Sequence, residues 1–289
     1  MSDKIIQKTI DQLKEYFQKR DDVLMAFLFG SQAKGRAMSG SDWDIAVYFK
    51  PAGKIIEFQA DRDFTQESEV WGDLIDILQT DNVDLIVLNR APATLADAAI
   101  EGEPLVIKDR GLFTEFMLRV TSEAIDFRQT VKEYAEVYWR SASLNEKDVE
   151  IVRKRLIFLN SELNDIEKFY SLDQFAYEND NAKRREAERL IENLMNAAID
   201  ISKTFLASEK RTVPGSYKEI LRSLYLIPNF SKTLGEQLSE WAELRNILAH
   251  EYPDIRWKRI EDFLKRSQPY FEELINGAKD FMLKNKEGV

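Results

Sequence analysis

The sequence contains no cysteine and a single histidine, His250, among its 289 residues. The absence of cysteine excludes a disulfide framework, a thiolate nucleophile and any zinc site that needs sulfur. The single histidine excludes a cluster of histidine ligands. Any metal site must therefore be built from carboxylates and other oxygen donors, which Mg²⁺, Mn²⁺ and Ca²⁺ prefer.

Long hydrophobic runs and an excess of positive charge are also missing. No apolar run approaches about 18 residues, so we expect no membrane-spanning helix. The N-terminal residues form a charged amphipathic pattern without the apolar core of a signal peptide, which predicts a cytoplasmic protein. With 41 Lys and Arg against 51 Asp and Glu, the net charge is −10. The chain is therefore not a general nucleic-acid binder, and any contact with RNA must depend on a local site.

The length suggests two domains, at about 150 residues each. In the first part, short apolar runs typical of buried strands (23–29, 45–49 and 85–88) alternate with helical patterns (4–19, 67–78 and 113–139). This alternation predicts a small α/β domain with a mixed or parallel sheet.

A polar segment rich in helix-capping residues, 141–148, follows the last of these helical patterns. Beyond it every pattern is helical: 149–170, 182–206, 216–225, 231–250 and 255–283. We therefore predict an α/β domain over residues 1–142 and an all-α helical bundle over residues 143–289.

Residues 29–47 of the first domain read FGSQAKGRAMSGSDWDIAV. Gly30 and Ser31 end a predicted strand and open a helix, where backbone N–H groups and the serine hydroxyl can bind phosphate. Asp42 and Asp44 are two apart at the start of the next strand, so their carboxylates share a face, and Asp84 opens a further strand. An isolated Asp-x-Asp pair is usually a loop or surface feature. The Gly-Ser at this spacing instead favours a two-metal site for phosphoryl or nucleotidyl transfer.

These residues resemble the motif of the polymerase-β nucleotidyltransferase superfamily, in its minimal nucleotidyltransferase branch, over about the first 140 residues. The resemblance implies transfer of a nucleoside monophosphate, with Mg²⁺ or Mn²⁺ as cofactor and ATP as donor. It implies that Asp42 and Asp44 bind both metals. Asp84 would complete the second metal site or deprotonate the acceptor, and Ser31, beside Gly30, would contact the triphosphate.

One position departs from that family pattern. The minimal branch often has arginine where this chain has Lys34, a change that keeps the charge but loses bidentate phosphate geometry. We expect the nearby Arg36 to compensate at the nucleotide-binding site.

The lone histidine lies in the sequence LRNILAHEYP, residues 244–253. Arg245 precedes His250 by five residues and Tyr252 follows it by two. This resembles the R-x4-H-x-Y signature of HEPN domains, all-α bundles of many bacterial ribonuclease toxins, over about residues 146–285. Asn246 resembles the polar residue often found after that arginine. Physically, an arginine that neutralises phosphate and a histidine that transfers protons suffice for metal-independent RNA cleavage. The implied substrate is RNA, with tRNA as one candidate.

Five residues on an ideal helix separate two side chains by about 140°, so one helix does not bring Arg245 and His250 together. The resemblance implies a two-fold homodimer whose paired motifs line one cleft. Asp200, on a different predicted helix, falls where HEPN toxins tend to carry an acid. It either supports the ribonuclease or pairs within the bundle. The structural alternative for His250 is that it closes a helix ahead of Pro253.

The two halves together resemble a fused minimal nucleotidyltransferase antitoxin and HEPN ribonuclease toxin, a type VII toxin–antitoxin pair. In that pair the transferase adds AMP to the tyrosine of the motif, which here is Tyr252. A tyrosine before proline is biased to an extended conformation, and AMP on it adds negative charge beside Arg245 and His250. Two alternatives stay open: an aminoglycoside-type nucleotidyltransferase with a helical C-terminal domain, and a nucleotide-sensing module without turnover.

Overall fold

The computed structural model describes residues 3–33, 42–51, 53, 56–140, 144–249 and 257–284. The chain forms two compact units, Met1–Asp126 and Phe127–Val289. Within the described residues, none of the helices combines the length and the apolar character needed to cross a bilayer.

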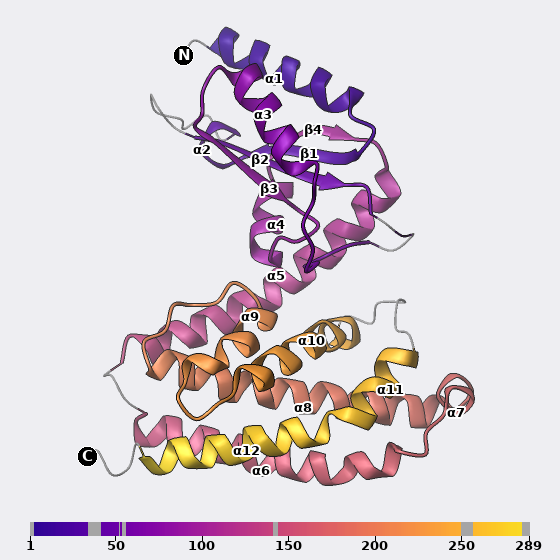
Figure 1. The fold of residues 1–289 in the computed structure, drawn as a ribbon, viewed down its shortest axis with the longest axis vertical. Helices are drawn as coiled ribbons and strands as arrows, with labels where there is room; N and C mark the ends of the chain where they lie inside the picture. Colours follow the sequence, from indigo (N-terminus) through magenta and orange to yellow (C-terminus); the bar gives the residue numbers. More distant parts are fainter. Residues whose placement is uncertain are drawn as a thin grey trace. The chain divides into compact units, whose positions relative to one another are not determined.

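The N-terminal unit is built on a mixed four-stranded sheet with the order β3-β2-β1-β4 (Figure 1). The strands are β1 (Val23–Phe29), β2 (Trp43–Phe49), β3 (Val83–Val87) and β4 (Glu103–Ile107). β1 is antiparallel to β2 and β4, whereas β2 is parallel to β3. The α/β class expected from the sequence is confirmed.

Helices cover both faces of this sheet, which explains why β1 and β2 are apolar at nearly every position. One face packs against α1 (Asp3–Lys19) and α3 (Glu67–Leu78), through Phe17 and Leu74 among others. The other face packs against α4 (Ala93–Ile100) and the first half of α5 (Arg110–Tyr138), through Phe116 and Val120. The short α2 (Gly30–Ala33) follows β1 directly.

Helix α5 contributes to the cores of both units. Phe116 and Ala124 belong to the hydrophobic core beneath the sheet, while Phe127 and Tyr134 belong to the core of the helical unit. The division between the two compact units therefore falls inside this helix. The predicted boundary at residues 142 and 143 lies after α5, in residues outside the described part.

The C-terminal unit is helical in all its described elements, as expected. It contains α6 (Glu146–Asp165), η1 (Ile166–Phe169), α7 (Gln174–Asn179), α8 (Asn181–Ser208), α9 (Tyr217–Arg222), η2 (Ser223–Leu226), α10 (Lys232–Ala249), α11 (Trp257–Arg266) and α12 (Gln268–Lys284). The capping segment predicted before α6 is confirmed at Asn145, whose side chain accepts a hydrogen bond from the Asp148 backbone N–H at 2.9 Å.

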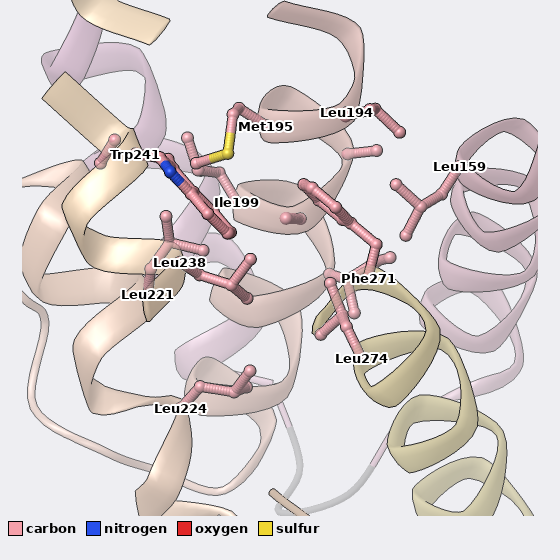
Figure 2. Close-up of a cluster of buried hydrophobic side chains, with 14 of the residues drawn as sticks. Leu159, Leu194, Met195, Ile199, Leu221, Leu224, Leu238, Trp241, Phe271 and Leu274 are labelled. Atoms are coloured by element: carbon pink, nitrogen blue, oxygen red, sulfur yellow. The ribbon is translucent and has the colours of Figure 1, made fainter. Parts of the chain in front are cut away.

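The core of this unit is organised around α8. Figure 2 shows Leu194, Met195 and Ile199 of α8 facing Trp241 of α10 on one side and Phe271 of α12 on the other. Because α8 is enclosed in this way, nearly all its residues from Leu194 to Ser208 are buried. Two buried hydroxyls of this stretch donate to carbonyls of their own helix, Thr204 to Asp200 at 2.8 Å and Ser208 to Phe205 at 2.8 Å.

The single helix expected over 255–283 is wrong, because α11 and α12 are separate and break at Ser267. The cause is Pro269. It has no N–H to donate, and in a continuous helix its ring clashes with the carbonyl of Lys265.

Candidate functional site

The predicted carboxylates gather at one end of the sheet. Asp44 in β2 and Asp84 in β3 are direct neighbours in the parallel register, so both side chains project from the same face. Asp42 precedes Asp44 by two residues and is exposed, as is Asp84, whereas Asp44 is half-buried. Asp44 and Asp84, in adjacent strands, and Asp42, just before β2, thus lie near one another, and their role as metal ligands stays a prediction.

Gly30 brings the end of β1 against the Asp44 carboxylate. Its φ of +70° lies in the left-handed region that favours glycine. A Cβ at this position would lie 1.9 Å from Asp44 Oδ2, so any other residue here would force the Asp44 carboxylate to move. Ser31 follows it as the second residue of α2. The Gly-Ser turn and the carboxylates therefore share one site.

Among the described residues of this site, three carboxylates repel one another. Burial raises the pKa of Asp44, and the neighbouring carboxylates of Asp84 and Asp42 raise that pKa further. Within the described residues, no three or more acidic or histidine side chains converge tightly enough to enclose a metal. The three carboxylates thus provide oxygen donors without enclosing a cavity, and the pKa of one of them, Asp44, is raised. Carboxylate oxygens are the donors that Mg²⁺ and Mn²⁺ prefer, and a divalent cation would neutralise this repulsion, but binding of either ion here stays a prediction.

Four of the predicted site residues lie outside the described residues. They are Lys34 and Arg36, expected to bind nucleotide, and His250 and Tyr252 of the R-x4-H-x-Y pattern. Their roles stay predictions.

Arg245 in α10 is buried at 8% exposure, which is unusual for arginine and requires partners. Its Nε donates to Asn196 Oδ1 of α8 at 2.7 Å, and its Nη1 donates to the neighbouring Asn246 Oδ1 at 3.3 Å. The guanidinium carbon lies 4.6 Å from the ring centroid of Tyr217, the first residue of α9. Asn246, predicted from the sequence, is thus in contact with Arg245.

Asp200 in α8 has other partners. Its carboxylate pairs with Arg155 of α6 at 2.8 Å and with Lys203 at 2.7 Å, and Lys203 also binds Glu133 of α5. Burial opposes the charge of Lys203, but these two carboxylates raise its pKa above the ordinary value. The described contacts of Asp200 are therefore interhelical ion pairs, and its role in RNA cleavage stays a prediction.

Two residues that contact Arg245, Asn196 and Tyr217, were not predicted from the sequence. Asn196 lies one helical turn before Asp200, so the spacing along α8 contained a signal for it. No local signal marks Tyr217, because it reaches Arg245 from a separate six-residue helix.

Comparisons with known proteins match two separate parts of the chain to two different families. Residues 11–111 match the family described as polymerase beta, nucleotidyltransferase, and residues 159–277 match the family described as ribonuclease HepT-like. No curated protein matches. A solved structure described as "Crystal structure of the toxin-antitoxin with AMP-PNP" is 22% identical, with a TM-score of 0.33, and the match covers 44% of this chain and 95% of that chain. The two family matches confirm both resemblances.

Proposed function

We propose that this chain, in which a nucleotidyltransferase segment precedes a HepT-like ribonuclease segment, is a fused toxin–antitoxin enzyme. In this proposal the N-terminal unit transfers AMP from ATP to Tyr252 and so inhibits the ribonuclease of the helical unit. The observation that carries the transferase assignment is the approach of Gly30 to Asp44, beside Asp84 in the adjacent strand.

In the transfer step, the Tyr252 oxygen attacks the α-phosphorus of ATP. A new P–O bond forms, the bond to the β-phosphate breaks, and pyrophosphate leaves. Asp42, Asp44 and Asp84 would hold the divalent cations, which supply charge neutralisation for the triphosphate and the leaving group. The tyrosine proton passes to Asp84 if this carboxylate is not bound to a cation, and to solvent if it is. The Ser31 hydroxyl is within the turn that would contact the phosphates.

For the helical unit we propose metal-independent RNA cleavage. The RNA 2′-oxygen attacks the adjacent phosphorus, forming a cyclic phosphate, and the bond to the 5′-oxygen breaks. His250 moves the protons, and Arg245 stabilises the charge on the phosphate. One histidine per chain supplies both an acid and a base only if two copies pair, so the active form is a homodimer.

In this proposal, the negative charge of the attached AMP inhibits the ribonuclease. AMP on Tyr252 places a phosphodiester two residues from His250 and seven from Arg245. This anion competes with the RNA phosphate for the same cation, without any need to unfold the nuclease.

The test is the intact mass of the full chain after incubation with ATP and Mg²⁺. We expect the mass to rise by one or more AMP units, carried on a peptide that contains Tyr252. Tyr252→Phe should remove this label, whereas Tyr225→Phe, at an exposed tyrosine of the same unit, should retain it. Asp42→Asn combined with Asp44→Asn should abolish labelling in a folded protein.

Other outcomes would reject the proposal. Modification of an added aminoglycoside with Tyr252 untouched would identify a small-molecule nucleotidyltransferase. ATP binding without any transfer would identify a nucleotide-sensing module.

A further inference from the structure

The guanidinium of Arg245 is held by contacts from three helices. Asn196 of α8 accepts from Nε, Asn246 of α10 accepts from Nη1, and the ring of Tyr217 in α9 lies against the guanidinium carbon. The two amide contacts lie at the edge of the guanidinium and the aromatic contact lies near its carbon. Together they are compatible with one orientation of the side chain, rather than the many that a free arginine samples.

Tyr217 is itself fixed in place. It is 3% exposed, and its hydroxyl lies 3.2 Å from the Thr130 hydroxyl of α5, within hydrogen-bond distance. Its ring meets the Phe127 ring edge-on, with centroids 5.1 Å apart and an angle of 84°. At the start of α9, the Ser216 side chain accepts from the Glu219 N–H and fixes the first turn. Tyr217, against which Arg245 lies, is therefore held by contacts with α5 and by the capped start of its own helix.

Asn196 contributes an acceptor that carries no charge. Its amide oxygen binds the Nε proton without adding a negative charge beside the guanidinium, whereas an aspartate here would compete with an anionic ligand. On the same helix, the carboxylate of Asp200 is paired with Arg155 and Lys203 instead. The amide and the acid of α8 thus have different partners.

We propose that Asn196 and Tyr217 are positioning residues for Arg245, which they hold in the orientation that receives an RNA phosphate. The inference rests on the proposed ribonuclease and adds to it two residues outside the R-x4-H-x-Y pattern. An arginine whose rotamer is already fixed loses less conformational entropy when it binds phosphate.

The first test observes Arg245 directly in the full chain, by the ¹H–¹⁵N resonance of its Nε–H group. The resonance is identified by its loss in Arg245→Lys. We expect slow solvent exchange in the wild type, fast exchange in Asn196→Ala, and a changed chemical shift in Tyr217→Leu because the ring current is lost. Asn193→Ala is the matched control, since that asparagine donates to Glu162 instead. An unchanged resonance in both folded variants, Asn196→Ala and Tyr217→Leu, would overturn the proposal.

The second test measures RNA cleavage by the full chain carrying Asp42→Asn and Asp44→Asn, which keeps Tyr252 unmodified. Asn196→Ala and Tyr217→Leu should each lower kcat/KM roughly 10- to 100-fold, the range expected when a catalytic group is misplaced. Tyr217→Phe keeps the ring and should stay within about threefold. Asn196→Asp retains the acceptor, so slow exchange should persist while the added charge weakens cleavage.

Combining variants separates positioning from a general structural role. In the Asn196→Ala background, Arg245→Ala should reduce kcat/KM for RNA cleavage far less than it does in the parent chain, because both changes remove the same interaction. If the fold-reduction in kcat/KM of the double variant equals the product of the two single reductions, the residues act independently. That result would overturn the proposal even if each single variant is less active. If the resonance responds as expected but no RNA is cleaved by the parent chain, the ribonuclease assignment fails while the geometry of Arg245 stands.

Discussion

At the scale of single residues, the transferase site depends on a contact between a glycine and a carboxylate. Gly30 occupies a left-handed conformation against Asp44, and this requirement is invisible in the sequence beyond the presence of Gly-Ser. The acids themselves could be predicted, because their alternation and position before strands are local features. The raised pKa of Asp44 could not, since it depends on the pairing of β2 with β3.

Gly30→Ala should remove AMP transfer and destabilise the N-terminal unit. The added Cβ meets Asp44 Oδ2, and the left-handed conformation alone costs about 1–2 kcal/mol for a residue with a side chain. Thermal unfolding and intact mass would measure the two effects. Gly72→Ala, in α3 with no atom within 4 Å of the new Cβ, is the control and should stabilise by about 0.5–1 kcal/mol. A Gly30→Ala protein as active and stable as the wild type would contradict the site geometry.

Asp44→Asn should raise the melting temperature in EDTA at neutral pH. The folded-state pKa of Asp44 is raised, so its charged form is less favourable in the fold than in the unfolded chain, and a neutral amide removes that cost. Mg²⁺ should raise the melting temperature of the wild type but not that of Asp44→Asn. Asp63→Asn, at an exposed acid elsewhere in the unit, is the control and should keep the Mg²⁺ response. Equal Mg²⁺ responses in wild type and Asp44→Asn would argue against a cation site here.

At the scale of elements, most helices and strands with a clear hydrophobic pattern were predictable, whereas short elements without one were not. The 67–78 helix and the 23–29 strand appear at their predicted bounds. β4 is a five-residue strand that contains Pro104, tolerated because β4 lies at the edge of the sheet. Tyr217 contacts Arg245 only because α9 packs beside α10, a tertiary relation that no local pattern encodes.

The ion pairs of Asp200 join elements, since they connect α8 to α6 directly and to α5 through Lys203. Asp200→Asn should therefore lower stability by about 1 kcal/mol, a modest figure because the pairs are partly exposed. RNA cleavage, measured well below the melting temperature, should remain within about threefold of the parent. A loss as large as that caused by His250→Ala would instead assign Asp200 to the ribonuclease site.

At the scale of the whole molecule, the boundary between the two compact units lies inside α5, between Asp126 and Phe127. Phe127 and Tyr134 lie in the core of the helical unit, and the Tyr134 hydroxyl donates to the Arg211 carbonyl at 2.9 Å. A boundary chosen from composition, within the polar segment 141–148, cannot reveal this because α5 has one continuous helical pattern. The bundle therefore draws on residues that precede the predicted boundary.

A fragment of residues 127–289 should unfold cooperatively, whereas residues 143–289 should melt at a lower temperature. The shorter fragment lacks Phe127, Tyr134 and the Thr130 contact to Tyr217. Loss of two such buried aromatic side chains costs several kcal/mol, at roughly 3–5 each. Calorimetry of the two fragments would measure the difference. Equal melting temperatures would show that the second half of α5 is dispensable.

RNA cleavage by residues 127–289 should persist in EDTA. The proposed chemistry uses proton transfer by His250 and charge stabilisation by Arg245, with no metal. His250→Ala and Arg245→Ala should each reduce cleavage at least roughly 100-fold, as removal of a proton-transfer or charge-stabilising group does. Cleavage that persists equally in both variants would indicate another nuclease.

The position of the hydrophobic cores along the chain also orders events during synthesis on the ribosome. Among the residues that the structure describes, the buried side chains of the two N-terminal clusters end at Ala124, whereas those of the helical cluster extend from Phe127 to Phe281. At about 5–20 residues added per second, on the order of ten seconds separates the emergence of these two limits. If the proposed function is correct, the nucleotidyltransferase unit of each nascent chain can therefore fold before the ribonuclease unit is fully synthesised. The ribonuclease would then be open to modification as soon as it folds.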